Sequence, residues 1–361
     1  MKNIKLRTII LLSGILSIPG LNANNVKQSN NNVMETLNLT QEWDKTFPKS
    51  DKIDHCKVTF INRYGITLAA DMYKPQNTTG KLSAIAVCGP FGAVKEQSSG
   101  LYAQEMAERG FLTIAFDPSF TGESGGTPRY MTSPDINTED FSAAIDFLVT
   151  HPDVDPEKVG VIGICGWGGL AINAAASDTR IKATVASTMY DMSRVEANGY
   201  FDASDSAEAR NETRRRLSEQ RTKDYLNGTP LLEGGVPDTL PENAPQFLRD
   251  YYDYYKTDRG YHSRSLNSNG GRNATSPIPW INTPLMSRAG EIENAVMIIH
   301  GEKAHSLYFG SDTYKNLTVT PGKDNNKILM IIPGASHTDL YDRKEIIPFS
   351  AMETFFNEHL K

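Results

Sequence analysis

The chain has 361 residues, of which 39% are hydrophobic and 22% charged, a composition typical of a globular protein with a sizeable core. A formal net charge of −6 argues against binding a phosphate backbone, so we expect no nucleic acid partner. Three cysteines are too few for a disulfide framework, and the seven scattered histidines form no zinc motif, so we expect no metal site.

The first 23 residues predict a signal peptide. Three basic residues within the first seven precede an apolar run over residues 8–19, and residues 21–23 resemble a small-residue cleavage site. We therefore expect an exported protein, periplasmic or secreted, whose net charge changes from −6 to −9 when those three cations are removed. The apolar run is short and interrupted, and no later stretch reaches the ~20 apolar residues of a transmembrane helix, so no membrane span is expected.

Residues 24–51 are polar, rich in asparagine and without periodicity, which predicts an N-terminal tether ahead of a folded domain over residues 52–361. At the start of that domain, residues 57–62 and 66–72 alternate apolar and polar side chains around Gly65. This pattern is typical of a β-hairpin with one exposed face.

The pattern then changes to short apolar runs separated by helical segments. The runs predict strands covered on both faces, at residues 83–88, 112–116, 159–164, 183–187, 295–300 and 328–332. The helical patterns lie at residues 100–109, 137–150, 169–177 and 346–360, with 138–140 as an acidic first turn. Such alternation predicts a doubly wound, mostly parallel α/β sheet, which binds its ligands at the carboxyl ends of the strands.

A long segment, about residues 192–290, interrupts the alternation, and we interpret it as a helical lid inserted into the domain. Its tyrosine-rich stretch, residues 251–255, is interpreted as packing between lid and body, with the lining of a substrate pocket as the alternative. The only basic run of the sequence, residues 214–216, is flanked by glutamates and predicts the solvated face of a helix.

Residues 159–170 combine an apolar strand, a glycine-rich turn and the start of a helix, the pattern of a nucleophile elbow. Cys165 stands at the apex of the turn, where its side chain would project above the sheet. The helix N-terminus that follows is expected to lower the pKa of the thiol and favour a thiolate. In the alternative interpretation, Cys165 is a small buried apolar residue.

His337 is the candidate general base. It lies in the loop between the last predicted strand and the last predicted helix, 172 residues after Cys165, in the order that a nucleophile-elbow fold requires. His300 and His305 are weaker candidates and are interpreted as structural.

Together these residues resemble the α/β-hydrolase superfamily, and within it the dienelactone-hydrolase-like branch that carries cysteine at the elbow. The resemblance covers residues 52–361. Three stretches, residues 88–97, 116–126 and 337–342, are similar to a little-characterised bacterial group of such hydrolases, and similar sequences also occur as polyketide thiohydrolases and transferases. The resemblance implies an acyl-enzyme mechanism.

The chain departs from the branch pattern at the elbow and in the oxyanion hole. Trp167 stands where the second elbow glycine belongs, and the following glycine is expected to take over its packing role. The oxyanion hole should use the N–H of Gly166 and a second N–H from the loop after residues 83–88. Pro90 has no N–H, which leaves Phe91 or Gly92 as the second donor.

The acid of the triad is the third departure, because Ala304 stands where the branch has aspartate. Two replacements stay open. Asp191 follows the strand predicted at 183–187, the alternative acid position of this fold, and Glu302 lies two residues before Ala304. We favour Asp191, whose role would be to hold the imidazole in one tautomer.

The sequence therefore predicts a hydrolase that cleaves an ester, thioester or lactone of a small-molecule acyl substrate through Cys165, His337 and an acid, without a cofactor. Two alternatives stay open: an acyltransferase or thiohydrolase acting on a carrier-bound acyl group, and a non-catalytic binding protein on the same fold.

Cys88 and Cys165 end neighbouring strands, so a redox-sensitive disulfide between them is feasible if the side chain of Cys88 points toward Cys165. The preferred interpretation is that Cys88 is a buried free thiol.

Overall fold

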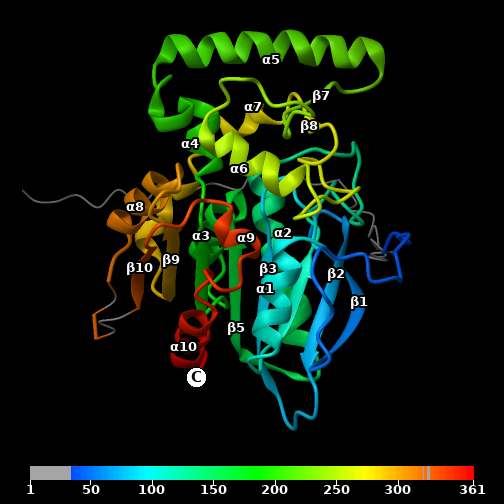
Figure 1. Cartoon of the computed structure of the whole chain (residues 1–361), viewed down its shortest axis with the longest axis vertical. Coiled ribbons are helices and arrows are strands. Elements are labelled where there is room, and N and C mark those ends of the chain that lie inside the picture. Colours follow the sequence, from blue (N-terminus) through cyan, green and yellow to red (C-terminus); the bar gives the residue numbers. More distant parts are fainter. Residues whose placement is uncertain (1–33, 320, 323–325) are drawn as a thin grey trace, which may run out of the picture. The chain divides into compact units, whose positions relative to one another are not determined.

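The computed structural model of the chain describes residues 34–319, 321–322 and 326–361 (Figure 1). The predicted signal peptide and the first part of the predicted tether lie outside these residues. Within the described ranges, no helix is both long and apolar enough to cross a bilayer.

The core is an eight-stranded sheet that confirms the predicted doubly wound, mostly parallel α/β architecture. In spatial order it contains β1 (Ile53–Ile61), β2 (Thr67–Pro75), β4 (Leu112–Phe116), β3 (Leu82–Cys88), β5 (Val154–Ile164), β6 (Ala183–Ser187), β9 (Ala295–Gly301) and β10 (Lys327–Ile332). β1 and β2 form the expected antiparallel hairpin, β2 pairs antiparallel with β4, and all other neighbours are parallel. β10 lies at the edge and is only half-buried, because no further strand covers it.

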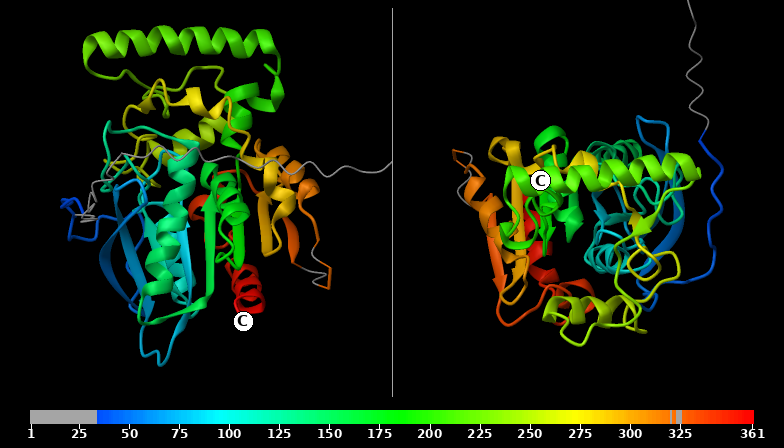
Figure 2. Two further views of the ribbon diagram at one scale, coloured as in Figure 1. Left: turned by 180° about the vertical axis from the view of Figure 1, so that it is seen from behind. Right: turned by 90° about the horizontal axis from the view of Figure 1, so that it is seen from above.

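Helices cover both faces of the sheet; some join its parallel strands, and the last two follow the last strand (Figures 1 and 2). They are α1 (Ser98–Ala107), α2 (Pro134–Thr150), α3 (Gly166–Ser177), α8 (Leu307–Asn316), α9 (Asp339–Asp342) and α10 (Phe349–His359). α2 begins three residues before its predicted start, because Ser133 caps it and Pro134 suits the first helical position. Asp140, predicted in an acidic first turn, is instead fully buried and accepts hydrogen bonds from Asn62 and Ser119.

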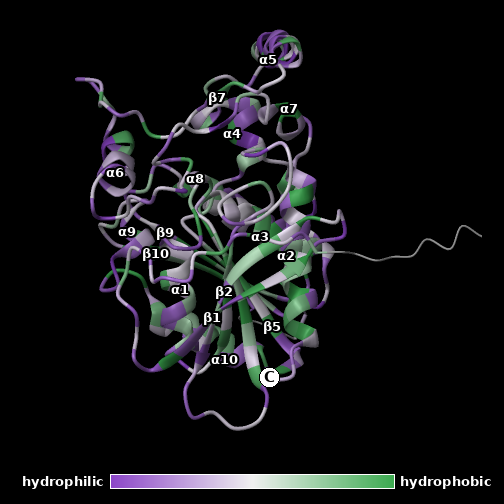
Figure 3. Cartoon of the chain, turned by 90° about the vertical axis from the view of Figure 1, so that its right-hand side faces the viewer, coloured by the Kyte–Doolittle hydropathy of each residue, from purple (hydrophilic) through white to green (hydrophobic). Residues whose placement is uncertain are grey.

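The insertion between β6 and β9 lies beyond the carboxyl ends of the strands (Figures 1 and 2). It contains α4 (Met192–Asn198), η1 (Tyr200–Asp202), α5 (Ala207–Asn227), β7 (Leu232–Glu233), α6 (Gln246–Tyr255), β8 (Arg272–Asn273), α7 (Pro277–Trp280) and η2 (Leu285–Glu291). In Figure 3, where α5 is seen end-on, its turns are mostly hydrophilic, in contrast to the central strands. The predicted basic run lies on α5, where Arg215 pairs with Glu212 and Arg216 with Glu233.

The described part of the predicted tether, residues 34–51, packs against the domain rather than hanging free. Phe47 is buried, and the ammonium of Lys45 lies 3.1 Å from the buried carboxylate of Asp71. Asp44 pairs with Arg264 of the insertion at 2.7 Å. The polar composition of this segment gave no sign of these contacts, because its charged side chains find their partners only in the folded domain.

Candidate active site

Cys165 lies in the turn between β5 and α3, with φ 58° and ψ −127°. A non-glycine residue rarely has a positive φ, so the surroundings must hold this conformation. The backbone N–H of Cys165 donates to the carbonyl of Ser187 at 3.0 Å, and its own carbonyl accepts from the N–H of Tyr190 at 2.9 Å. Ser187 ends β6 and Tyr190 lies in the loop that follows it, so the neighbouring strand and its loop fix the turn from which the thiol projects.

Two glycines allow β5 and α3 to approach each other at this turn. A β-carbon on Gly163 would lie 2.1 Å from the carbonyl oxygen of Trp167, and one on Gly168 would lie 2.6 Å from the β-carbon of Met189. Gly168 therefore occupies the close-packed position that the elbow pattern gives to its second glycine. The ring of Trp167 is buried and packs edge-on against Phe116, away from the nucleophile.

Backbone N–H groups of Phe91 and Gly166 both form hydrogen bonds with the sulfur of Cys165. These are two of the three residues predicted for an oxyanion hole. Gly92, the third, uses its carbonyl instead, which accepts from the N–H of Asn267 at 3.0 Å. The side-chain amide of Asn267 also donates to the carbonyl of Phe91 at 2.8 Å, so the insertion holds the loop that carries this N–H.

The thiol of Cys165 is only 7% exposed, and burial raises its pKa above the ordinary value. Hydrogen bonds from the hydroxyls of Tyr341 and Tyr251 and from the backbone of Phe91 and Gly166 lower the pKa but do not outweigh burial. The sequence predicted a thiolate from the helix N-terminus, and this prediction is wrong for the resting site, because desolvation disfavours the charged form more strongly. The resting thiol of Cys165 is therefore neutral and keeps its proton.

His337 lies between β10 and α9 and is 1% exposed. Its Nε2 lies 3.0 Å from the hydroxyl of Tyr341, and its Nδ1 lies 2.8 Å from Oγ1 of Thr188 and 2.7 Å from Oγ of Ser306. Burial, with a smaller contribution from the neighbouring His305, holds the pKa of His337 well below its ordinary value. The imidazole is therefore neutral and can accept a proton.

The two hydroxyls occupy the regions where the triad acid was expected. Thr188 follows β6 directly, and Ser306 lies in the loop after β9, two residues beyond Ala304. Both side chains are fully buried. In this chain, hydroxyl groups rather than a carboxylate orient the imidazole at Nδ1.

Neither predicted acid reaches the histidine. The carboxylate of Asp191 caps α4, where it accepts from the N–H of Arg194 at 3.0 Å and the hydroxyl of Ser193 at 2.5 Å. Glu302 is exposed and accepts from the N–H of Gly334 at 2.8 Å. Within the described ranges, neither carboxylate forms a hydrogen bond with His337, since each is already engaged at a helix or loop terminus.

His305, interpreted from the sequence as structural, forms part of the wall around His337. Its ring centroid lies 5.1 Å from that of His337 and 4.5 Å from that of Phe247, and its Nε2 bonds to the hydroxyl of Tyr190. Burial lowers the pKa of His305 to about 4 and, with His305 nearby, that of His300 to about 3. All three histidines are therefore neutral at physiological pH.

Cys165 opens into a cavity of about 390 Å³ whose walls are mainly aromatic. The aromatic wall residues are Phe91, Tyr190, Tyr200, Phe247, Tyr251, Tyr255 and Tyr341. α6 thus contributes pocket-lining tyrosines at 251 and 255, whereas Tyr254 is buried outside the cavity, so both interpretations of the tyrosine-rich stretch hold for different residues. The volume is within the range of small-molecule sites.

One ion pair reaches the cavity wall. Arg272 pairs with Glu196, and its guanidinium lies 5.1 Å from the ring centroid of Phe91. Because each charge is compensated by the other, the cavity offers a small substrate mostly aromatic surface with one polar side.

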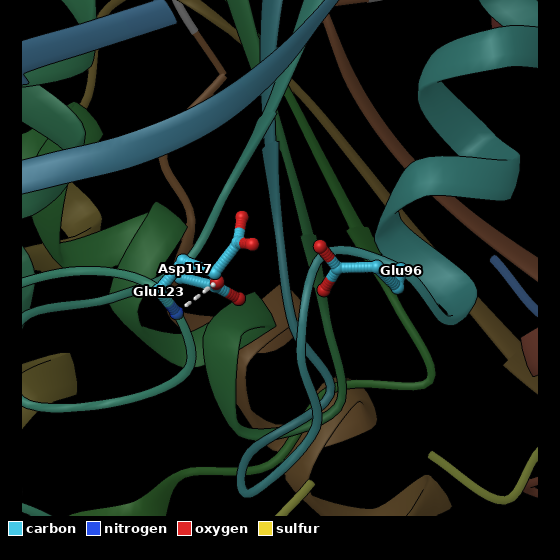
Figure 4. A group of neighbouring side chains, drawn as sticks. All are labelled: Glu96, Asp117 and Glu123. Carbon is cyan, nitrogen blue, oxygen red and sulfur yellow. Dashed lines mark hydrogen bonds between the residues drawn. The ribbon is translucent and has the colours of Figure 1, made fainter. Parts of the chain in front are cut away.

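Three buried carboxylates converge in a second cluster, formed by Glu96, Asp117 and Glu123 (Figure 4). Their oxygens are spaced as in a metal site, but the ammonium of Lys95 lies among them, at 2.6 Å from Glu96, 2.9 Å from Asp117 and 2.6 Å from Glu123. Burial alone would raise the carboxylate pKa values, yet Lys95 lowers that of Glu123 to about 2. The lysine therefore supplies the positive charge that a metal ion would otherwise bring.

This charge cluster joins two of the sequence stretches that carry the family resemblance. The carboxylate of Asp117 accepts from the backbone N–H of Lys95 and of Glu123, both at 2.8 Å. Lys95 belongs to the loop that also carries Phe91. The cluster thus fixes the far end of the loop whose N–H faces the nucleophile.

The three cysteines are free. The thiol of Cys88 donates to the carbonyl of Phe116 on β4 at 3.4 Å, and burial raises its pKa. Cys88 is thus directed toward β4 rather than toward Cys165, in line with the preferred interpretation of a buried free thiol.

Sequence reasoning missed the residues that contact His337. Tyr341 follows it by four residues, which in a helical turn places both on one side, and this spacing could have drawn attention to it. Thr188 directly follows a predicted strand, a position that was searched only for carboxylates. Ser306 offered no comparable signal.

A family model described as X-Pro dipeptidyl-peptidase (S15 family) matches residues 64–301, more than half of the chain. The chain belongs to this family of α/β-hydrolase type. The uncharacterized protein PA2218 of Pseudomonas aeruginosa is 53% identical over 98% of this chain and 95% of its own length. The crystal structure of PA2218 gives a TM-score of 0.86 at 56% identity and covers 90% of this chain and 99% of that one.

More distant matches carry functional names. Thiohydrolase aneE of Aspergillus aculeatus is 32% identical over 36% of this S15-family chain and 39% of its own length. The α/β hydrolase GrgF from Penicillium sp. sh18 gives a TM-score of 0.67 at 17% identity, covering 85% of this chain and 99% of that one, and this likeness shows the α/β-hydrolase fold alone. The dienelactone-hydrolase-like branch that the motifs suggested stays a prediction.

Proposed function

We propose that this protein hydrolyses an ester, thioester or lactone of a small acyl substrate through a covalent acyl-enzyme on Cys165. The observation that carries the proposal is the position of the Cys165 sulfur. It lies at a strained strand-to-helix turn, bonded by two backbone N–H groups and open to an aromatic cavity. A cysteine that served only as a buried apolar residue would require none of these features.

In the proposed reaction, His337 takes the thiol proton and the sulfur of Cys165 attacks the acyl carbonyl. The carbonyl oxygen becomes an anion, and the N–H groups of Phe91 and Gly166 hold it, as oxyanion-hole donors do. The imidazolium then protonates the leaving alcohol or thiol. His337 next activates a water molecule that releases the acid and restores the thiol.

Thr188 and Ser306 orient the imidazole in this proposal, in place of the acid that the sequence predicted. A hydroxyl oxygen can accept the Nδ1–H and leave Nε2 free to accept a proton. It stabilises the imidazolium less than a carboxylate would. A thiol ionises more readily than a serine hydroxyl, so a cysteine nucleophile depends less on a strong acid partner.

The test combines a substrate panel with detection of the intermediate. Short aryl esters, thioesters, lactones and X-Pro amides are incubated with the protein, and intact mass is measured after rapid quenching. We expect an acyl adduct that maps to Cys165, and no turnover by Cys165→Ala at a melting temperature close to that of the wild type. Cys88→Ala, which removes another buried thiol, is the matched control. Undiminished turnover by Cys165→Ala would contradict the proposal.

The same panel tests two further candidates. Likeness to a thiohydrolase favours a carrier-bound acyl group, and faster product formation with an added thiol or alcohol acceptor would assign acyl transfer. The family model favours cleavage of X-Pro amides, and Glu196 is the carboxylate in the cavity wall that could meet a substrate ammonium, although Arg272 pairs with it. Preference for X-Pro amides over esters would assign peptidase activity.

A further inference from the structure

We propose that Tyr341 is a catalytic residue whose hydroxyl carries the proton between Cys165 and His337. This inference rests on the proposed function, because it needs Cys165 as the nucleophile. It adds a residue that the sequence motifs did not single out and assigns a specific step to it.

The first argument is the position of the hydroxyl. It lies 3.0 Å from Nε2 of His337 and also forms a hydrogen bond with the sulfur of Cys165. Tyr341 and Cys165 both line the cavity, whereas His337 is buried behind the wall. In the described part of the chain, no direct hydrogen bond joins the histidine to the cysteine. The hydroxyl of Tyr251 also contacts the sulfur, but it bonds to Tyr190 at 2.9 Å. Among the described residues, the hydroxyl of Tyr341 is therefore the one that contacts both the sulfur and His337.

The second argument is that this hydroxyl is held in place. Tyr341 is fully buried, and its ring packs edge-on against Tyr254, at 5.0 Å between centroids, and against Tyr255 at 6.2 Å. The preceding carbonyl, of Leu340, accepts a hydrogen bond of 2.6 Å from the hydroxyl of Tyr102. A proton relay needs a hydroxyl group that is held in a fixed position, and this packing holds the hydroxyl of Tyr341 in place.

The proton balance of the step follows from the neutral resting groups. The S–H bond of Cys165 breaks and its proton passes to the oxygen of Tyr341, while the O–H proton of Tyr341 passes to Nε2 of His337. The sulfur lone pair forms the bond to the acyl carbon, and the π electrons of the carbonyl move to its oxygen. Tyrosine is a phenol before and after, and His337 holds the proton until the leaving group takes it back.

The pKa of Tyr341 favours a group that accepts one proton while donating another, rather than a base that holds a proton. Burial raises its pKa well above the ordinary value, so the phenolate is disfavoured and no net charge rests on it. Without this hydroxyl, the thiol of Cys165 keeps, among the described side chains, only the hydroxyl of Tyr251, which bonds to Tyr190 and not to His337. Loss of the hydroxyl should therefore act on the chemical step and leave substrate binding largely unchanged.

The experiment compares Tyr341→Phe with Tyr254→Phe in the full-length protein, using whichever ester or thioester the wild type turns over. Tyr254 is a buried tyrosine on α6 that packs on the ring of Tyr341, but its hydroxyl lies outside the cavity, beside the backbone of Ser98. We expect Tyr341→Phe to lower kcat by ~10²-fold or more, the usual scale for lost proton transfer, with KM changed by less than about threefold. Alkylation of Cys165 by iodoacetamide at neutral pH should slow in parallel, and Tyr254→Phe should change neither rate.

A purely structural tyrosine would give another result. If Tyr341→Phe keeps more than about half of the wild-type kcat, or loses activity only in proportion to its melting temperature, the relay is overturned. Should that variant fold poorly, a ring-fluorinated tyrosine at position 341, which keeps the shape but has a more acidic phenol, replaces it. A changed kcat and alkylation rate then support the relay, and unchanged values overturn it.

Failure of this inference can be told from failure of the proposed function. An acyl adduct on Cys165 together with a fully active Tyr341→Phe protein removes only the relay. Full activity of Cys165→Ala removes the proposed function, and the relay with it.

Discussion

Two buried polar networks lie at the carboxyl edge of the same sheet, and burial affects them in opposite ways. Around Cys165, the thiol, the phenol of Tyr341 and the imidazole of His337 all have pKa values shifted toward their neutral forms. Around Lys95, the ammonium is stabilised and the pKa of Glu123 is lowered to about 2, so these groups stay charged.

The difference lies in whether an opposite charge is at hand. Desolvation disfavours every charged form, and only a close counter-charge offsets it. The network at Cys165 has hydroxyls as partners, so it remains neutral and can pass a proton at little cost in reorganisation. In the cluster at Lys95, three carboxylates lie among the cations of Lys95, Lys57 and Arg264. These cations hold the pKa values of Glu96 and Glu123 below the ordinary value, although burial raises that of Asp117, and the cluster serves to hold a loop.

The sharpest way to break the comparison is Lys95→Met, which should have the largest effect on stability. It removes the central cation of the cluster and leaves Lys57 and Arg264 as the remaining partners of its buried carboxylates. We expect a loss of about 3–5 kcal/mol in the free energy of unfolding. Urea denaturation at neutral pH measures it. Lys52→Met, which removes an exposed lysine paired with Glu108, should change stability by less than about 0.5 kcal/mol. Equal effects of the two substitutions would show that the cluster is not an ionic unit.

Substitutions in the neutral network around Cys165 should lower enzymatic activity more than stability. We expect His337→Ala to reduce kcat by ~10²-fold or more, the scale of a lost general base, as measured in steady-state kinetics on the substrate identified above. His305→Gln and His300→Gln serve as comparison variants, because both histidines are buried near the site but lie outside the proposed proton path. A smaller loss for His337→Ala than for either of these variants would move the base to another histidine.

A moderate effect is expected from the hydroxyls that orient the imidazole. Thr188→Val and Ser306→Ala should each lower kcat by about fivefold to tenfold, which corresponds to the loss of one hydrogen bond of about 1–1.4 kcal/mol. Asp191→Asn should cost less activity than either variant and more than Glu302→Gln, because Asp191 is buried at the start of α4 and Glu302 is exposed. A greater loss for one of these acid variants would return the orienting role to a carboxylate.

The smallest effect per residue is the pH dependence of stability. The folded protein keeps His300, His305 and His337 neutral, whereas in the unfolded chain they bind protons near pH 6.5. The free energy of unfolding should therefore fall as pH drops below 6.5, by about 1 kcal/mol per histidine per pH unit. Below pH 6 Asp140 opposes this trend, because burial raises its pKa to about 6 and the folded state takes up a proton there.

Urea denaturation at closely spaced values between pH 7.5 and 5.5 tests this slope. His300→Leu should reduce the slope of the unfolding free energy against pH by the contribution of one histidine, about 1 kcal/mol per pH unit. Glu123→Gln should leave the slope unchanged, because Glu123 has its pKa lowered to about 2 and does not titrate in this window. A stability that is constant from pH 7.5 to 5.5 would show that the three histidines are not kept neutral in the folded state.

The sequence alone was sufficient for the order of the main strands along the chain and for the elbow and the histidine loop, but it did not predict α8 between β9 and β10. Apolar runs such as residues 183–187 reveal buried strands, and residues 159–170 reveal the elbow, because these signals are local: side-chain periodicity and turn glycines act over a few residues. In a doubly wound sheet, the carboxyl ends of parallel strands meet at one edge. The predicted strands therefore placed Cys165 and His337 at the same edge of the sheet.

Only the tertiary structure decided which groups surround the histidine. Asp191 was the expected acid, yet its carboxylate caps α4, and hydroxyls from the loops after β6 and β9 contact the imidazole instead. Whether a thiol rests as thiolate likewise depends on desolvation, which results from the packing of distant segments around it. Contacts between residues far apart in the chain, such as Tyr341 with Cys165 or Lys95 with Glu123, leave no local pattern, because their chemistry exists only once the fold has brought them together.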